Sequence, residues 1–212
     1  RIKEIYYDLD IDWIAYDSKN GGDVYAQEFT ESYMHEERGV EFRGFTSAVE
    51  EELQVANINK VNALSDKTID VNAIPCLIPV TASSDFNSLI WQDLKVRLQR
   101  GDIRFLIGEF ELEEMNESTK AKRMAWSKYT SEEKMRIKLP HVQTEFLCEE
   151  MINLTAHYKE GKVKLTEPRS GFKDRAVSLA YANYIATLLE NKLAREHNDI
   201  DYNDINDWTL VI

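Results

Sequence analysis

The sequence predicts an α/β protein in which strands and helices alternate along the chain. Two apolar runs, Ile74–Val80 and residues 103–107, have the length and composition of strands. In residues 86–98 and 173–196, apolar side chains recur every three to four positions, which is the spacing of one helical face. An all-α or an all-β fold does not fit this alternation.

The expected strands follow from local composition. Residues 4–8 are expected to form a strand that ends in the carboxylate of Asp8, and residues 39–45 a further strand. The polar stretch between them, residues 30–38, is expected to be a surface helix or a loop. Because two prolines interrupt Ile74–Val80, that strand is expected at an edge of the sheet. Residues 103–107 are the best candidate for a buried strand.

The expected helices have recognisable ends. Ser83, Ser84 and Asp85 offer N-caps for the helix after Ile74–Val80, and Gly101 is placed to end that helix. Pro140 is expected to open a later helix, since proline is tolerated in a first turn. Its apolar positions are Val142, Phe146, Leu147, Ile152 and Leu154.

The rest of the second half carries a charged segment, a turn and a long helix. Residues 109–138 are acidic first and basic later, and we expect a solvated helical excursion, with a DNA-contacting surface as the alternative. Residues 159–162 are expected to turn the chain into a strand at 163–165. The last helix is expected over residues 173–196, with its inner stripe formed by Val177, Ala180, Tyr181, Tyr184, Ile185, Leu188 and Leu189.

Composition limits the classes of function. The chain has 212 residues, 43% of them hydrophobic, so we expect one domain over residues 1–197 and a poorly ordered acidic tail over 198–212. The formal charge of −12 argues against a protein that coats nucleic acid with a broad basic surface. No apolar run is long enough to cross a membrane and no secretory signal is evident, so a cytoplasmic location is expected.

The residue types with catalytic potential are mainly carboxylates. Cys76 and Cys148 lie far apart without zinc-ligand spacing, and the four histidines are scattered. Asp8 at a strand end and Asp174 at a helix start remain as candidates for binding divalent metal ions through hard oxygen ligands. An Asp at a helix start is also a common cap or partner of the helix dipole, which is the alternative for Asp174.

A resemblance to a known family sharpens this hypothesis. Residues 171–184, which begin Gly-Phe-Lys-Asp-Arg and continue Ala-Val-Ser-Leu-Ala-Tyr, resemble the last nuclease motif of phage terminase large subunits. In that motif a metal-binding Asp precedes a helix that reads Ser-Leu-Ala-Tyr. Residues 78–105 and the helix after Pro140 are similar to further elements of the family. Tyr7-Asp8 and residues 13–17 resemble its middle acid and the segment that follows.

Two departures from the family pattern bear on the site. No Walker A glycine loop occurs, so we expect the upstream ATPase domain to be lacking. The strand with the first catalytic Asp is also expected to be lacking, because the chain opens where the second acid belongs. In the alternative assignment, Asp8, Asp10 and Asp12 form the first motif, and the second acid is Asp102 or Glu109.

The resemblance implies an RNase H-like fold, a mixed central sheet flanked by helices, and a Mg²⁺- or Mn²⁺-dependent endonuclease with two metal ions. Asp8 and Asp174 would be catalytic, Asp8, Asp10 and Asp174 would hold the metals, and Lys173 and Arg175 would flank the DNA phosphate. The implied partners are double-stranded viral DNA, the portal protein and the small terminase subunit. The implied location is the host cytoplasm, transiently on the prohead, without a membrane.

Two other functions stay open at this stage. A non-catalytic or incomplete terminase fragment would dock on the portal or on DNA, and the lacking first acid favours it. An unrelated acidic α/β interaction protein requires that the Lys-Asp-Arg helix be a coincidence. Metal-dependent cleavage by the isolated chain discriminates the enzyme from both.

Overall fold

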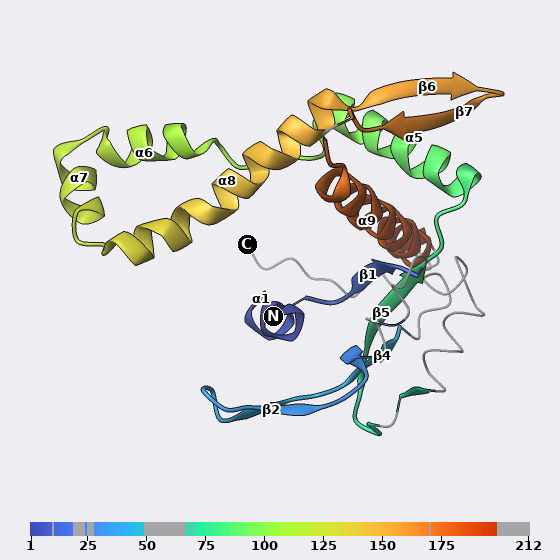
Figure 1. The fold of residues 1–212 in the computed structure, drawn as a ribbon, viewed down its shortest axis with the longest axis horizontal. Helices are drawn as coiled ribbons and strands as arrows, with labels where there is room; N and C mark the ends of the chain where they lie inside the picture. The colour runs from blue at the N-terminus through green and yellow to red at the C-terminus, as the bar shows by residue number, and fades with distance from the viewer. Residues whose placement is uncertain are drawn as a thin grey trace, which may run out of the picture. The chain divides into compact units, whose positions relative to one another are not determined.

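The computed structural model describes residues 1–9, 11–18, 24, 28–48, 67–68, 70–169 and 171–198. These residues form a mixed α/β protein, as predicted (Figure 1). The chain divides into two compact units, one of Arg1–Ser83 with Tyr184–Ile212 and one of Ser84–Asn183. The predicted acidic tail lies, except for Asn198, outside the described residues. Among the described helices, none is long and apolar enough to cross a membrane.

The first unit contains a three-stranded parallel sheet in the order β1-β5-β4. Its strands are β1 (Ile14–Asp17), β4 (Phe45–Ser47) and β5 (Ile74–Val80). The edge position predicted for Ile74–Val80 is wrong, since β5 is central and nearly continuously buried, as parallel strands commonly are. Pro75 is accommodated because it pairs with Thr46, where the register of β4 shifts.

The strand predicted at residues 4–8 is a helix, α1 (Ile2–Leu9). Tyr6 lies against the ring of Phe45 with centroids 4.9 Å apart, while Tyr7 stacks on Phe42 at 4.6 Å. Consecutive side chains of a strand point to opposite faces, whereas neighbours on a helix are only about 100° apart and can both reach the core. Asp8 is therefore near the end of a helix and not at a strand end.

Lys3, on the same helix, has an unusual environment for a lysine. It is 4% exposed, its ammonium donates to the Glu31 carbonyl, and it lies 5.3 Å from the ring centroids of both Tyr33 and Phe45. Burial lowers the pKa of Lys3 because removal from water disfavours the charged form. The carbonyl and the two rings offset part of that cost.

A short antiparallel pair follows α1 in the same unit. It consists of β2 (Tyr33–His35) and β3 (Val40–Phe42), so the surface helix or loop predicted at 30–38 contains a strand instead. The strand expected at 39–45 is present as two pieces, β3 and the start of β4. Gly44 separates them, and a Cβ there would lie 2.2 Å from the Thr30 carbonyl oxygen. This close approach requires glycine.

The second unit begins with α5 (Ser84–Arg100) and includes an antiparallel hairpin, β6 (Thr155–Lys159) and β7 (Lys162–Thr166). Helix α5 confirms the helix predicted after Ile74–Val80. Gly101 follows α5 with φ 74°, as expected of a glycine that ends a helix. The hairpin turn predicted at 159–162 is also confirmed. Both of its central residues have positive φ, Glu160 at 52° and Gly161 at 76°, as in a type I′ turn.

The buried strand predicted at residues 103–107 is wrong. These residues are irregular, and Phe105, Leu106 and Ile107 are 38%, 51% and 40% exposed. An apolar run becomes a strand only where another strand pairs with its backbone, and the described part of this unit offers no such pairing. The strand expected at the end of the family-like segment 78–105 is therefore an irregular stretch in this structure.

The charged segment is helical, as predicted, and mostly exposed. It contains α6 (Glu109–Glu117), α7 (Lys120–Trp126) and the start of α8 (Ser131–Asn153), and Figure 1 shows α6 and α7 beside the N-terminal half of α8. The prediction that Pro140 opens a helix is wrong, because a capping box of Thr130 and Glu133 starts α8 earlier. Lys138 joins α8 to α6 through Glu109, at 3.1 Å, and Glu113.

The last helix, α9 (Asp174–Asn198), matches the prediction within two residues. Among the residues of α9 whose burial is described, 174–194, the buried ones are Ala176, Ala180, Tyr181, Asn183 and Ile185. Asn183 donates from Nδ2 to Asp93 Oδ2 at 2.6 Å, so a polar residue on the buried side is tied to α5. The Lys-Asp-Arg motif therefore lies at the start of a well-packed helix.

Candidate functional site

Asp174 is the first residue of α9 and its side chain is exposed. A carboxylate at this position is favoured by the partial positive charge of the helix N-terminus. Within the described part of the chain, its carboxylate has no hydrogen-bond or ion-pair partner. Asp174 is thus available to an external ligand.

The start of α9 is fixed by Glu150 of α8, a residue that the sequence analysis did not single out. Glu150 is 9% exposed and accepts hydrogen bonds from the backbone N–H groups of Arg175 at 2.9 Å and Ala176 at 3.2 Å. It also accepts one from Nη1 of Arg175 at 2.7 Å. Glu150 therefore caps α9 from another helix and is saturated with protein donors.

Arg175 is held on three sides. Besides Glu150, its Nε donates to Gln143 Oε1 at 3.2 Å, and its guanidinium lies 5.3 Å from the centroid of the Phe146 ring. Lys173 donates to Glu167 Oε2 at 2.6 Å, and this hydrogen bond lowers the pKa of Glu167. Both cations predicted to flank a phosphate thus have carboxylate partners from their own unit.

A hollow of about 300 Å³ lies beside this helix start. Gly171 at its rim packs closely, since a Cβ there would lie 2.5 Å from Pro168 Cγ. Asp174 is not part of the lining, which is formed by Phe146, Glu149, Glu150, Asn153, Pro168, Gly171, Phe172 and Arg175. The hollow therefore presents two aromatic rings, the saturated carboxylate of Glu150 and the exposed Glu149 to solvent.

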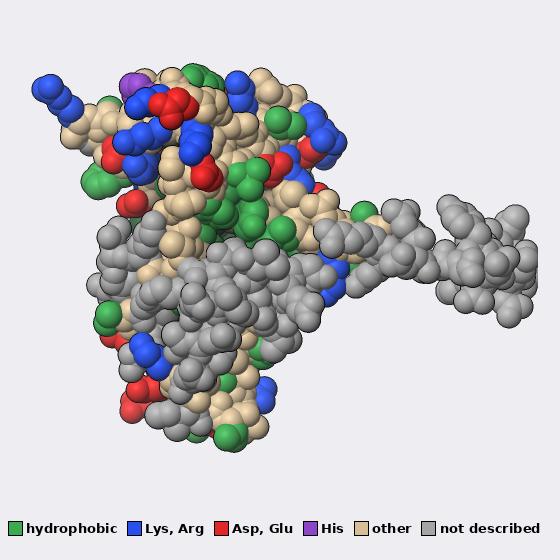
Figure 2. All heavy atoms as spheres, turned by 90° about the vertical axis from the view of Figure 1, so that its right-hand side faces the viewer, with side chains coloured by type: hydrophobic (Ala, Val, Ile, Leu, Met, Phe, Trp, Pro, Cys, Tyr) green, Lys and Arg blue, Asp and Glu red, His purple; other side chains and the backbone are tan. Residues whose placement is uncertain are grey.

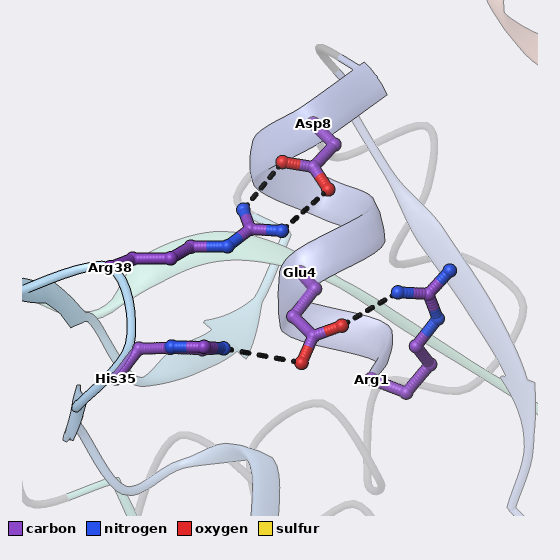
Figure 3. A network of polar contacts seen from close by, with 5 residues as sticks. All are labelled: Arg1, Glu4, Asp8, His35 and Arg38. Carbon is purple, nitrogen blue, oxygen red and sulfur yellow. Dashed lines mark hydrogen bonds and ion pairs between the residues drawn. The ribbon is translucent and has the colours of Figure 1, made fainter. Parts of the chain in front are cut away.

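Asp8 belongs to a polar network of the first unit (Figure 3). Arg38, in the turn between β2 and β3, donates to both carboxylate oxygens of Asp8, at 2.6 and 3.0 Å. These hydrogen bonds from Arg38 lower the pKa of Asp8. A bidentate guanidinium occupies the lone pairs that a metal ion would use, so Asp8 must exchange Arg38 for a metal if it serves as a ligand.

Glu4 lies one turn earlier in the same network. It accepts from Arg1 at 2.7 Å and contacts His35 Nε2 at 3.3 Å, as Figure 3 shows. The hydrogen bond from Arg1, and then that from His35, lowers the pKa of Glu4. This cluster was not predicted from the sequence, because no local signal indicates that His35 and Arg38 contact Glu4 and Asp8 across 31 and 30 residues.

The other predicted acids have separate environments. Asp10 lies outside the described residues, and Asp12 is exposed just before β1. Asp102 pairs with Arg100 at 3.3 Å and Glu109 with Lys138 at 3.1 Å, in the second unit. Neither lies beside central strands as expected, because residues 103–107 are not a strand.

Oxygen ligands of this kind suit Mg²⁺ or Mn²⁺ chemically. However, within the described ranges no three His, Cys, Asp or Glu side chains are grouped so that they hold a metal ion. Asp8 and Asp174 lie in different units. Of the two predicted metal ligands that the structure describes, Asp174 has a carboxylate that protein groups leave open, whereas Arg38 occupies that of Asp8.

Comparisons of the chain with protein-family models, with curated proteins and with solved structures give no match. The class that the structure defines is a mixed α/β protein with a small parallel sheet, a helical excursion and a β-hairpin.

Proposed function

We propose that the chain is the nuclease part of a viral DNA-packaging terminase large subunit, an RNase H-like endonuclease that cuts concatemeric double-stranded DNA. One observation carries this proposal. In the Lys-Asp-Arg motif, Asp174 is exposed and open at the start of a helix that Glu150 fixes in place. Glu150 already caps the N-terminus of α9, so the stability of this helix start does not require Asp174.

The order of elements supports the same proposal. Strand β5 leads into α5, and a glycine turn follows at Gly101, in the order that the resemblance implies. Helix α8 precedes the motif, and the residues Ser-Leu-Ala-Tyr lie in the first turns of α9. Residues 103–107 depart from that order because they are not a strand.

In this function Mg²⁺ or Mn²⁺ would be bound by the exposed carboxylate of Asp174, and the resemblance names Asp8 and Asp10 as the further acids. A bound pair of such ions activates water and stabilises the leaving oxygen of a phosphodiester. Lys173 and Arg175, which the resemblance assigns to the DNA phosphate, would instead keep the loop and the helix start in position through Glu167 and Glu150. The portal protein and the small terminase subunit are the proposed protein partners, on the prohead in the host cytoplasm.

The test is cleavage of supercoiled plasmid by the full chain in Mn²⁺, Mg²⁺ and EDTA. Asp174→Asn is the central variant, because it removes the charge and keeps the shape. Glu132→Gln is the matched control, since Glu132 is an exposed acid in the first turn of another helix, α8. Metal-dependent cutting by the wild type and by the control, but not by Asp174→Asn, is the expected result. Cutting that survives in Asp174→Asn contradicts the proposed site.

A second candidate is a non-catalytic terminase fragment that docks on the portal or on DNA. The observation that favours it is the bidentate Arg38 on Asp8, which leaves that carboxylate neutralised. It predicts no cutting in any metal, with binding to duplex DNA or to portal protein retained. Arg38→Gln separates the two functions, since it frees Asp8 and raises cleavage only if Asp8 is a ligand.

A further inference from the structure

The β6–β7 hairpin has two chemically different faces. Residues that pair across an antiparallel ladder share a face, and the face alternates along each strand. The register places apolar Ala156, Tyr158, Val163 and Leu165 on one face. The other, here called the outer face, carries Thr155, His157, Lys159, Lys162, Lys164 and Thr166.

The apolar face of the hairpin is turned toward α5. Val163 donates its backbone N–H to Ser88 Oγ of α5 at 2.9 Å. A groove of about 620 Å³ lies between the two elements, and its lining includes Trp91 and Val96 of α5 together with Tyr158 and Leu165 of the hairpin. The outer face consequently lies on the side of the hairpin away from this groove, except that the Lys162 ammonium forms an ion pair with Asp85 of α5.

The outer face brings two cationic side chains directly opposite one another, because Lys159 pairs with Lys162. Lys164 lies on the same face, opposite His157. Like charges in directly opposite positions destabilise a hairpin, at Cβ distances of about 5 Å. All four side chains are exposed, and the arrangement occurs in a chain whose formal charge is −12. Composition therefore does not account for it.

The acids near the outer face neutralise it only in part. Glu160 lies 3.7 Å from Lys159, and both side chains are largely exposed. Asp85 pairs with Lys162 at 2.5 Å, and Glu167 is taken by Lys173. Exposed pairs of this kind contribute little, and Lys164 has no ion pair among the described residues. Figure 2 shows Lys and Arg side chains gathered around a few acids at the upper end, where Figure 1 places the hairpin.

We propose that the outer face of the β6–β7 hairpin binds the phosphate backbone of duplex DNA. The face is open and extended, with Lys162 and Lys164 two residues apart along one strand, about 6.6 Å. An open row of cations suits a polymer with regularly spaced charges better than a small anion, which requires an enclosed site. Anionic phosphates also relieve the repulsion between the opposed cations. The charge arrangement by itself indicates a polymer with regularly spaced negative charges. The choice of DNA as that polymer rests on the proposed function.

The experiment measures binding of a fluorescent 20-base-pair duplex by the full chain in EDTA, so that no cleavage intervenes. The variant is Lys159→Gln with Lys164→Gln. The control is Lys120→Gln with Lys122→Gln, which removes the same charge from exposed positions of α7. Each lost phosphate contact reduces the magnitude of the negative slope of log K against log salt by about 0.9. The hairpin variant is thus expected to have a slope smaller in magnitude by about 1.8 and to lose more affinity at low salt than at high salt, with the control close to wild type.

Three results would overturn the proposal: no duplex binding by the wild type, equal effects of the hairpin variant and the control, or competition by polyglutamate as strong as by DNA. The last result would assign the outer face to an acidic protein. Asp174→Asn is included as a further arm and is expected to bind the duplex normally. If a variant loses cleavage but still binds the duplex, the proposed nuclease site is tested and DNA binding by the outer face is not contradicted. Failure of the proposed function and failure of the proposed DNA-binding face therefore give different results.

Discussion

Glu150 is the residue whose loss should reveal how the Lys-Asp-Arg motif is positioned. Its carboxylate accepts the backbone N–H groups of Arg175 and Ala176 and the guanidinium of Arg175. The perturbation is Glu150→Ala, which removes all three acceptors at once. The expected effect is destabilisation of the second unit, centred on the first turn of α9.

The magnitude follows from the burial of each donor. Ala176 is fully buried, so its unpaired N–H costs about 1–3 kcal/mol. The N–H of the exposed Arg175 can bond water, and its loss resembles removal of an N-cap, about 1 kcal/mol. The Arg175 side chain is 42% exposed, which limits the ion pair to about 0–1 kcal/mol. The variant should lose roughly 2–5 kcal/mol of stability by these principles.

Urea unfolding with hydrogen exchange on α9 is the assay. The matched control is Glu149→Ala, which removes a neighbouring, exposed glutamate of the same helix. With urea slopes of about 1–3 kcal/mol/M, the expected loss lowers the midpoint by about 1 M or more. Amides at the start of α9 should also exchange faster in Glu150→Ala alone. Equal midpoints for the two variants would refute the assignment of Glu150 as the cap.

Other predictions concern pH, the hairpin turn and metal binding. Arg38 lowers the pKa of Asp8 in the folded state. The stabilisation that the ionised Asp8 gives the fold is therefore complete above its unfolded pKa near 3.9 and is lost as pH falls through the lower folded value. The difference in unfolding free energy between wild type and Asp8→Asn should accordingly shrink below about pH 4. Glu160→Asn should raise the melting temperature, because asparagine tolerates the positive φ of 52° in this turn, whereas Gly161→Ala should cost about 1–2 kcal/mol. Mn²⁺ at about 100 times its dissociation constant should stabilise the wild type by about 2.7 kcal/mol in a thermal melt, and Asp174→Asn should abolish that shift.

The helices with clear ends could be predicted from the sequence. Gly101 and the apolar spacing before it identified α5, and the Glu160-Gly161 turn was correctly placed. Pro140 misled the prediction, since a strong capping box upstream outweighed the one backbone hydrogen bond that the proline removes. Local signals compete, and their relative strength is not evident from position alone.

Strands were predicted less well because their stability depends on partners. Residues 103–107 have the composition of a strand, but no strand pairs with them in the described part of their unit. The reverse holds for the largely polar segment 30–38, in which Tyr33–His35 forms β2 because β3 lies opposite. Glu150 and Arg38 escaped prediction for a related reason, since each contacts its candidate acid or motif across 25 or 30 residues. Such contacts leave no periodic signal.

Arg175, next to Asp174, is held by protein partners, whereas Lys164 on the hairpin has no ion pair among the described residues. This difference leads to a final prediction. Arg175 is bound by Glu150, Gln143 and the Phe146 ring, which only a planar guanidinium can satisfy together. Arg175→Gln should therefore lower stability and leave the magnitude of the salt slope of DNA binding unchanged. Lys159→Gln with Lys164→Gln should reduce the magnitude of the slope and leave stability unchanged or higher, because opposed charges are removed. If Arg175→Gln instead reduces the magnitude of the slope by about 1 at constant stability, Arg175 contacts phosphate and its contacts with α8 are secondary.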